Sequence, residues 1–169
     1  MSELEQALQT LKQPEYVHVL LNPMPVYGLA CGVLGLIVAL LLKSRQAQFV
    51  ALVIVIAASV SVWPVVRFGH QGYDRVYSMS NTEGQQWLDV HADRAGDGQY
   101  VFYATALLAL AAILIPRKFP RATLPLVGAT LVLSLAALAT GAWISHAGGQ
   151  VHHTEFRNGP PPKLEEREK

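Results

Sequence analysis

Four long apolar runs constrain this chain more than any other feature of its sequence. They contain no charged residue and no histidine, and they are Val26–Leu42, Phe49–Val66, Tyr100–Ile115 and Ala122–Ile144. A helix needs about 20 mostly apolar residues to cross the roughly 30 Å of hydrocarbon in a bilayer. Only helices satisfy the backbone polar groups of such single runs internally. With 51% hydrophobic and 15% charged residues, the chain is also too apolar for an ordinary soluble domain. The sequence therefore predicts an all-α fold, an integral membrane four-helix bundle.

The predicted organisation is one membrane domain followed by a tail. Residues 1–157 form the four-span domain, with spans at about 24–42, 49–67, 98–115 and 122–145. We expect a short polar helix within Met1–Gln13 and a long outer loop over 67–99. That loop is predicted to carry a short outer helix over Thr82–Ala95, capped by Asn81 and lying near the membrane surface. The tail 158–169, which is rich in proline and charge, is expected to be disordered.

The distribution of charge predicts the orientation in the membrane. Two short loops carry five basic residues and no acid, and these are Lys43, Arg45, Arg117, Lys118 and Arg121. All 12 acidic residues lie in the N-terminal segment, in the 67–99 segment or in the C-terminal part from Glu155 onward. The positive-inside rule then places both short loops in the cytoplasm and both termini outside. We expect a multi-pass protein of the bacterial inner (plasma) membrane, with both termini periplasmic.

The chain also shows signs of an internal repeat. Each half contains an outer histidine, a span, a basic turn, a second span and another histidine followed by X-Gly. His18 precedes the first turn as His91 precedes the second, and His70 and His146 close the second span of each half. The local sequences Gly69-His70-Gln71-Gly72 and Ser145-His146-Ala147-Gly148 are also similar. This pattern predicts two repeated helical hairpins related by an axis along the membrane normal.

All six histidines fall on one side of the predicted membrane, namely His18, His70, His91, His146, His152 and His153. Histidine is the commonest side-chain ligand for haem iron, zinc and copper. The repeat is expected to bring His70 and His146 to matching heights, and His18 and His91 to matching positions. Two facing histidines on separate helices in a partly apolar setting are typical of a haem with two axial imidazoles. The pair His70 and His146 is the stronger candidate, because both its position and its local sequence recur.

Charged residues on the same side complete this hypothesis. Arg67, Arg75 and Arg94 are candidates to pair with haem propionates. Asp89, Asp93 and Glu155 are candidates to accept the second ring N–H of a ligand histidine. Sequence motifs exclude covalent c-type haem, since there is no CxxCH, and give no HExxH or Cys–His zinc spacing.

Other kinds of site remain open. Copper or zinc held by several of the six histidines fits the same residues, and so does a structural subunit with no cofactor. No nucleophile with a base partner is visible, so an electron-transfer or accessory subunit is a better expectation than a stand-alone enzyme. A net charge of +1 without a basic stripe gives no support for nucleic-acid binding.

The chain resembles a family of small bacterial four-helix membrane proteins of undefined function. The similarity covers about residues 15–157 and includes the opening His18–Pro25, His70 and His91. Its most specific part is the stretch 145–155, which is similar to a pattern of His-X-Gly-Gly followed by His-Thr-Glu. Where the family usually has histidine in an Asn-His-X-Pro opening, this chain has Pro23. The resemblance implies a candidate b-haem or redox function.

Taken together, the residues and the resemblance lead to one expected function. We expect a membrane subunit that binds haem b, or is otherwise associated with redox chemistry, and works at the outer face. Its expected partners are the lipid bilayer and other membrane or periplasmic redox subunits. The alternatives are a histidine-based copper or zinc binding or transport accessory protein, and a structural subunit of a larger membrane complex.

Overall fold

The computed structural model describes residues 2–164, and these are almost entirely helical. The α-helices are α1 Glu3–Thr10, α2 Pro14–Leu21, α3 Leu29–Leu41, α4 Arg45–Val60, α5 Val62–Met79, α6 Thr82–Leu114 and α7 Thr123–His152. A π-helical turn, Met24–Gly28, joins α2 to α3. Short 3-10 segments cover Ile115–Arg117, Pro120–Ala122 and Thr154–Phe156. The expected all-α bundle is thus confirmed.

Four composite helices are long and apolar enough to cross a membrane, and they run Pro14–Leu41, Arg45–Met79, Thr82–Arg117 and Pro120–His152. The first two pack as one antiparallel hairpin, through α2 against α5 and α3 against α4. The last two, α6 and α7, form the second hairpin. The hairpins join where α4 and α5 contact α6 and where α3 contacts α7, so spans one and three are diagonal across the bundle.

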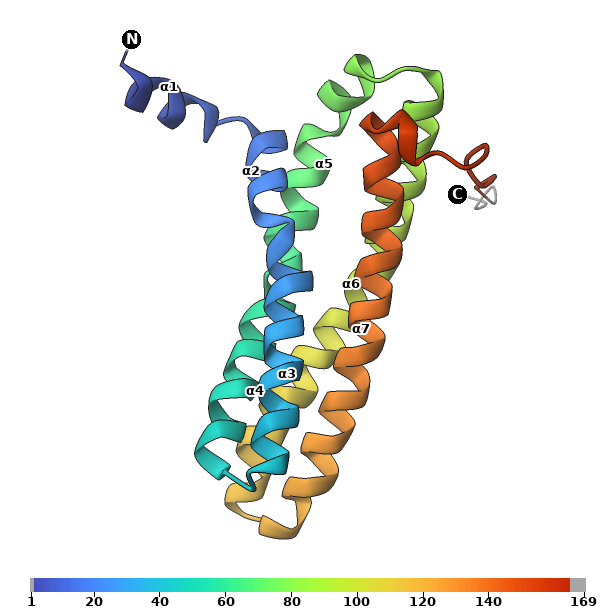
Figure 1. Ribbon diagram of the computed structural model, residues 1–169. Helices are drawn as coiled ribbons and strands as arrows, with labels where there is room; N and C mark the ends of the chain where they lie inside the picture. Colours follow the sequence, from blue (N-terminus) through green and yellow to red (C-terminus); the bar gives the residue numbers. More distant parts are fainter. Residues whose placement is uncertain (1, 165–169) are drawn as a thin grey trace.

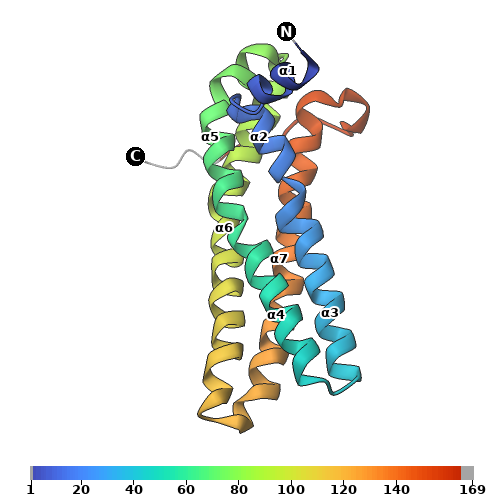
Figure 2. The same ribbon diagram turned by 90° about the vertical axis from the view of Figure 1, so that its left-hand side faces the viewer.

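The two ends of the bundle differ in charge. At the basic end, the turn Leu42–Ser44 and the segment Ile115–Ala122 connect the helices of each hairpin. At the histidine end lie α1, the α5–α6 connection and the last turn of α7, as both views of the ribbon show (Figures 1 and 2). All six histidines lie toward this second end. Four spans and this polarity agree with a multi-pass membrane protein.

The 67–99 segment differs from its expected form. No long loop with a separate surface helix is present, because α5 continues to Met79 and α6 begins at Thr82. The predicted cap is confirmed, since the Asn81 side chain accepts a hydrogen bond of 2.8 Å from the Gly84 N–H. The helix after it belongs to the continuous α6, with Trp87, Leu88 and Val90 buried against Tyr73 and Val76 of α5 and the last turns of α7. Those apolar residues face neighbouring helices rather than lipid.

The C-terminal segment closes the histidine end. Arg157 donates hydrogen bonds to the carbonyls of Gln150 and Val151 at the end of α7, at 2.8 and 2.9 Å. Its guanidinium also lies 3.1 Å from the Glu83 carboxylate in the first turn of α6. This satisfies carbonyls that a helix end leaves free and ties α7 to α6. Residues 158–164 form no helix, and the rest of the predicted tail, 165–169, lies outside the described residues.

The two hairpins share one pattern of buried positions. An offset of 73 residues relates buried residues of α3 and α6, and the pairs are Leu29–Phe102, Gly32–Thr105, Leu36–Ala109 and Ala39–Ala112. An offset of 79 relates α4 and α5 to α7, through the pairs Ala51–Thr130, Val55–Ser134, Ala58–Ala137 and Val62–Gly141. The offsets differ because the turn of the second hairpin is longer than that of the first. This repeat positions the candidate site described below.

Candidate histidine site

A cavity of about 780 Å³ lies between the two hairpins at the histidine end. Side chains from α2, α5, α6 and α7 line it, so both hairpins contribute to its wall. Five of the six histidines are among its lining residues, and the exception is His146. Most of the remaining wall is valine, alanine, glycine and Phe102. The site is therefore an apolar space with a few imidazoles.

His18 projects from α2 and is held by α5. Its Nδ1 lies 2.8 Å from the Val65 carbonyl oxygen. Because a carbonyl only accepts, Nδ1 carries the proton and the Nε2 lone pair is free. One turn further along α5, Gly69 faces the ring, and a Cβ at that position would lie only 2.9 Å from Nδ1. One backbone carbonyl thus orients the imidazole, and the absence of a side chain at Gly69 leaves room for the ring.

His91 repeats this arrangement in the second hairpin. It projects from α6, and its Nδ1 lies 3.0 Å from the Ile144 carbonyl oxygen of α7. Four residues later, a Cβ on Gly148 would lie 3.0 Å from Nδ1 and Cε1 of the ring. His91 follows His18 by 73 residues, the offset that relates α3 to α6. Val65 and Gly69 correspond to Ile144 and Gly148 with the offset of 79. The two histidine supports are therefore equivalent parts of the repeat.

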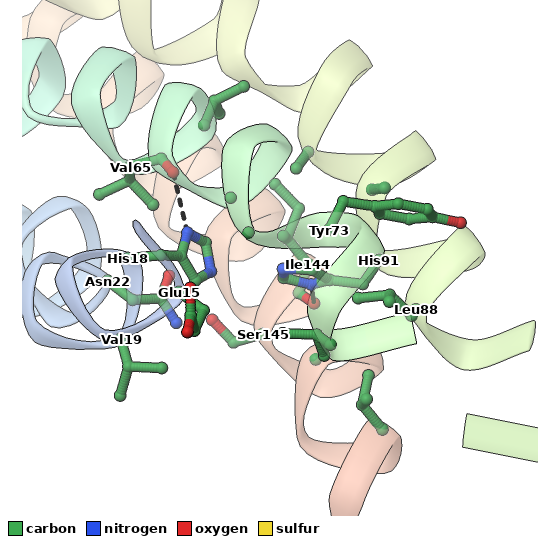
Figure 3. A pocket seen from close by; sticks show the side chains of 18 of the residues that line it. Glu15, His18, Val19, Asn22, Val65, Tyr73, Leu88, His91, Ile144 and Ser145 are labelled. Carbon is green, nitrogen blue, oxygen red and sulfur yellow. Dashed lines mark hydrogen bonds between the residues drawn. The ribbon is translucent and has the colours of Figure 1, made fainter. Parts of the chain in front are cut away.

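The two imidazoles meet across the diagonal of the bundle. Their ring centres lie 6.1 Å apart and their planes are inclined by 81°. In Figure 3 the rings enter from opposite sides of the pocket, with one nitrogen of each turned toward the other ring. Both side chains are half-buried. The arrangement places two imidazoles, each bound through Nδ1 to a backbone carbonyl, next to each other in one mostly apolar cavity.

The spacing of these rings fits a metal centre between them. A metal bound by imidazole lies about 2.0–2.1 Å from the nitrogen. The centre of the ring lies about 1.2 Å behind that nitrogen, from C–N bonds of about 1.3 Å. Two imidazoles bound to one metal from opposite sides therefore have ring centres about 6.4 Å apart. The observed 6.1 Å is close to this value.

The structure does not bring His70 and His146 together as the sequence pattern predicted. Both are exposed. His146 packs edge-on against Trp87, with ring centres 6.3 Å apart, and its Nε2 lies 3.2 Å from the side-chain nitrogen of Gln150. With the offset of 79, the counterpart of His70 is Gly149. His146 therefore lies three residues before the position that is equivalent to His70. Three residues are close to one helical turn, so the sequences around the two histidines look similar although the histidines are not equivalent in the repeat.

The other predicted residues lie around the rim. His152 and His153 line the cavity but are exposed. His153 Nδ1 lies 3.0 Å from a Glu155 carboxylate oxygen, as the sequence suggested. A backbone hydrogen bond and the one to His153 hold the pKa of the exposed Glu155 carboxyl below its usual value. Asp89 accepts a hydrogen bond from the Tyr73 hydroxyl instead of supporting His91.

The arginines proposed for propionates are engaged within the protein. Arg75 forms an ion pair of 2.7 Å with Glu15, which joins α5 to α2. Arg67 lies over the ring of Trp63, at 5.9 Å from its centre. Arg94 lies 4.3 Å from the centre of the Trp143 ring and donates a 3.0 Å hydrogen bond to the Trp143 carbonyl. Only Arg75 of these three lines the cavity.

Sequence reasoning missed the supports of the two histidines. Every residue has a backbone carbonyl, so no sequence motif could have indicated that those of Val65 and Ile144 bind the two histidines. Gly69 and Gly148 did carry a signal, since each lies at the end of a span with the same offset from a turn. Among the described residues, no group of three or more His, Cys, Asp or Glu side chains converges as a metal site. No family model, curated protein or solved structure matches the chain.

Proposed function

We propose that this protein is a membrane haem-b-binding subunit in which His18 and His91 would hold the haem iron. The observation that carries the proposal is the meeting of two imidazoles from equivalent positions of the repeat inside one cavity. The 6.1 Å separation of their ring centres supports binding of one iron by both side chains. A bound b-haem would supply one-electron redox chemistry.

The supports of the two imidazoles suit this role. A ligand histidine that donates its other N–H to a backbone carbonyl has a fixed tautomer and ring orientation and is a stronger base. His18 and His91 are both arranged in this way, through Val65 and Ile144. Gly69 and Gly148 allow α5 and α7 to approach the rings closely. Each hairpin thus supplies one ligand and its support.

The cavity also suits a large, flat, mostly apolar group. Its volume of about 780 Å³ lies within the range of cofactor sites, roughly 300–1,000 Å³. Phe102, Val62 and Val66 lie on the side toward the membrane centre and exclude water from the imidazoles. Glu15 and Arg75 line the polar side of the cavity. They form an ion pair in which the arginine side chain is more than half exposed. The apolar side and the polar side match the two sides of a haem.

A metal ion without porphyrin is the second candidate. Zinc sites use three or four protein ligands, which the two converging imidazoles do not provide. Copper binds imidazole ligands readily. If the site holds a metal ion without porphyrin, copper between His18 and His91 is therefore the form that fits these residues. By the positive-inside rule, the histidine end faces the periplasm, where a redox partner would exchange electrons with the site.

Optical spectroscopy of the full-length protein tests the proposal. The protein would be produced with haem supplied, purified in detergent, and measured oxidised and reduced. We expect a Soret band and b-type bands in the reduced state. The His18→Ala and His91→Ala variants should each lose the haem, whereas the matched exposed-histidine variants His70→Ala and His146→Ala should retain it.

Three results would contradict the proposal. Bound copper without a Soret band would favour the metal-ion alternative. Neither haem nor metal would favour a structural subunit. Haem that survives both the His18 and the His91 substitution but is lost from the His70 or His146 variant would show that other histidines are the ligands.

A further inference from the structure

A second, smaller cavity lies at the basic end, between the two hairpins. Its volume is about 240 Å³, and α4, α6, α7 and the segment after α6 line it. Its rim carries two arginines, Arg45 and Arg117. Its inner wall is apolar and includes Leu52, Ile113 and Val127. The cavity thus has a cationic mouth and an apolar floor.

Gln48 is the unusual residue in this wall. It lines the cavity and is only 9% exposed, although it is a polar side chain in the first turn of a membrane-spanning helix. Among the described residues, its side-chain amide has no hydrogen-bond partner. The amide lines the cavity, so a polar group that enters this space can satisfy it. The amide NH₂ offers two donors toward such a group.

The arginines at the mouth are similarly unpaired. Within the described chain, neither Arg45 nor Arg117 forms an ion pair with a carboxylate, and the acidic residues of this part lie toward the other end. A guanidinium presents a planar set of donors that suits phosphate oxygens. The cavity also lies beside the start of α4, which is capped by Ser44, and the N-terminus of a 16-residue helix favours an anion.

The asymmetry between the repeats creates this cavity. The second turn, Ile115–Ala122, is longer than Leu42–Ser44, and it supplies Pro116 and Arg117 to the wall. With the offset of 79, the counterpart of Gln48 is the apolar Val127. The amide is therefore present in one half of the repeat only, and the equivalent position of the other half packs with an apolar side chain.

The position of the cavity identifies the source of the anion. Phe49 lines it and is 50% exposed on the flank of α4, where the span meets lipid. A lipid phosphate at the two arginines would place its glycerol and first acyl carbons against Phe49, Leu52 and Ile113. A free phosphate would leave this apolar floor unused. Basic pockets between membrane helices are a recurrent way of binding anionic headgroups.

We propose that this cavity binds the phosphate of one anionic glycerophospholipid, held by Arg45, Arg117 and the amide of Gln48. This site is independent of the haem proposal, since it lies at the opposite end of the bundle. Its ligand comes from the leaflet that faces the basic end. The bound lipid ties the turn of the second hairpin to the first turn of α4.

Native mass spectrometry of the full-length protein in detergent tests the proposal. Phosphatidylglycerol, phosphatidylcholine and inorganic phosphate would be added separately, and the bound species counted. We expect one tightly retained phosphatidylglycerol. Arg117→Gln, and separately Gln48→Val, should weaken its retention about tenfold through lost charge-assisted hydrogen bonds or a lost amide donor. Arg45→Gln, at an exposed position, should weaken retention by a similar factor.

Arg121→Gln is the matched control, because it removes the same charge from the same end without lining the cavity. It should leave lipid retention unchanged. Equal losses in the Arg121 and Arg117 variants would show general surface attraction and overturn the site. Equal retention of phosphatidylcholine would overturn its selectivity for anionic lipid. Binding of inorganic phosphate as tightly as phosphatidylglycerol would overturn the assignment to lipid.

Discussion

Alanine at Gly69 or Gly148 tests the role of the repeated histidine support. In each case the new Cβ would lie 2.9–3.0 Å from Nδ1 of an imidazole. Carbon and nitrogen atoms pack at about 3.5 Å or more, so the ring or the helix must shift by about half an ångström. The ring is held by its hydrogen bond to Val65 or Ile144, and a shift of this size weakens that bond.

The magnitude follows from two opposing effects. Overpacking of a close contact costs about 1–3 kcal/mol. Alanine in place of glycine within a helix returns about 0.5–1 kcal/mol. We therefore expect Gly69→Ala and Gly148→Ala to lose about 0–2.5 kcal/mol of stability. Displacement of the imidazole should also weaken haem binding about 5- to 30-fold, which corresponds to roughly 1–2 kcal/mol.

Two other helical glycines provide matched controls. A Cβ at Gly96 or Gly128 would meet nothing within 4 Å. Gly96→Ala and Gly128→Ala should therefore raise the thermal midpoint of the detergent-solubilised protein slightly and leave haem titrations unchanged. Thermal unfolding measures the first effect and haem titration the second. If Gly69→Ala and Gly148→Ala behave like these controls in both assays, the glycine support of the histidines is refuted.

Three further predictions concern the ends of the bundle. Arg157→Ala should lower the free energy of unfolding by about 2–3 kcal/mol, since it removes the charge-assisted hydrogen bonds of a buried guanidinium. A thermal midpoint equal to that of the wild type would show that Arg157 does not hold α7 to α6. Truncation after Asn158 should leave the bundle and its cofactor intact, because it retains Arg157; loss of membrane insertion would show that the tail belongs to the fold. In a Cys31→Ser background, a cysteine at Ser44 should label only from the cytoplasm and one at Ser80 only from outside, and the opposite result would invert the orientation.

The fold could be predicted from the sequence because membrane insertion leaves few alternatives. Uncharged runs of 16–23 residues such as Tyr100–Ile115 and Ala122–Ile144 are sufficient to define spans. The outer segment 67–99 was harder, since its polar residues resemble a loop. Leu88 and Val90 suggested a surface helix, but they pack against α5 and α7 instead. Apolar spacing on a helix predicts one buried face and does not say whether lipid or protein covers it.

The candidate site could be predicted only in part. His18 and His91 were identified as matching positions, and the structure brings them together. The sequence pattern favoured His70 and His146 as the ligand pair, because each lies near a span end and is followed by X-Gly. The displacement of three residues is short along the sequence. It nevertheless rotates the side chain around the helix axis, and this rotation decides which side chain points into the bundle. The carbonyls that orient the imidazoles depend on helix packing, which no residue pattern encodes.

Electron paramagnetic resonance of the oxidised, haem-loaded protein tests the central claim most directly. Two histidine ligands make ferric haem low-spin, and imidazole planes inclined near 81° should give a highly anisotropic low-spin signal. We predict this signal in the wild type and its loss in both His18→Ala and His91→Ala. A high-spin signal in the wild type, or a low-spin signal that persists in either variant, would contradict axial ligation by this pair.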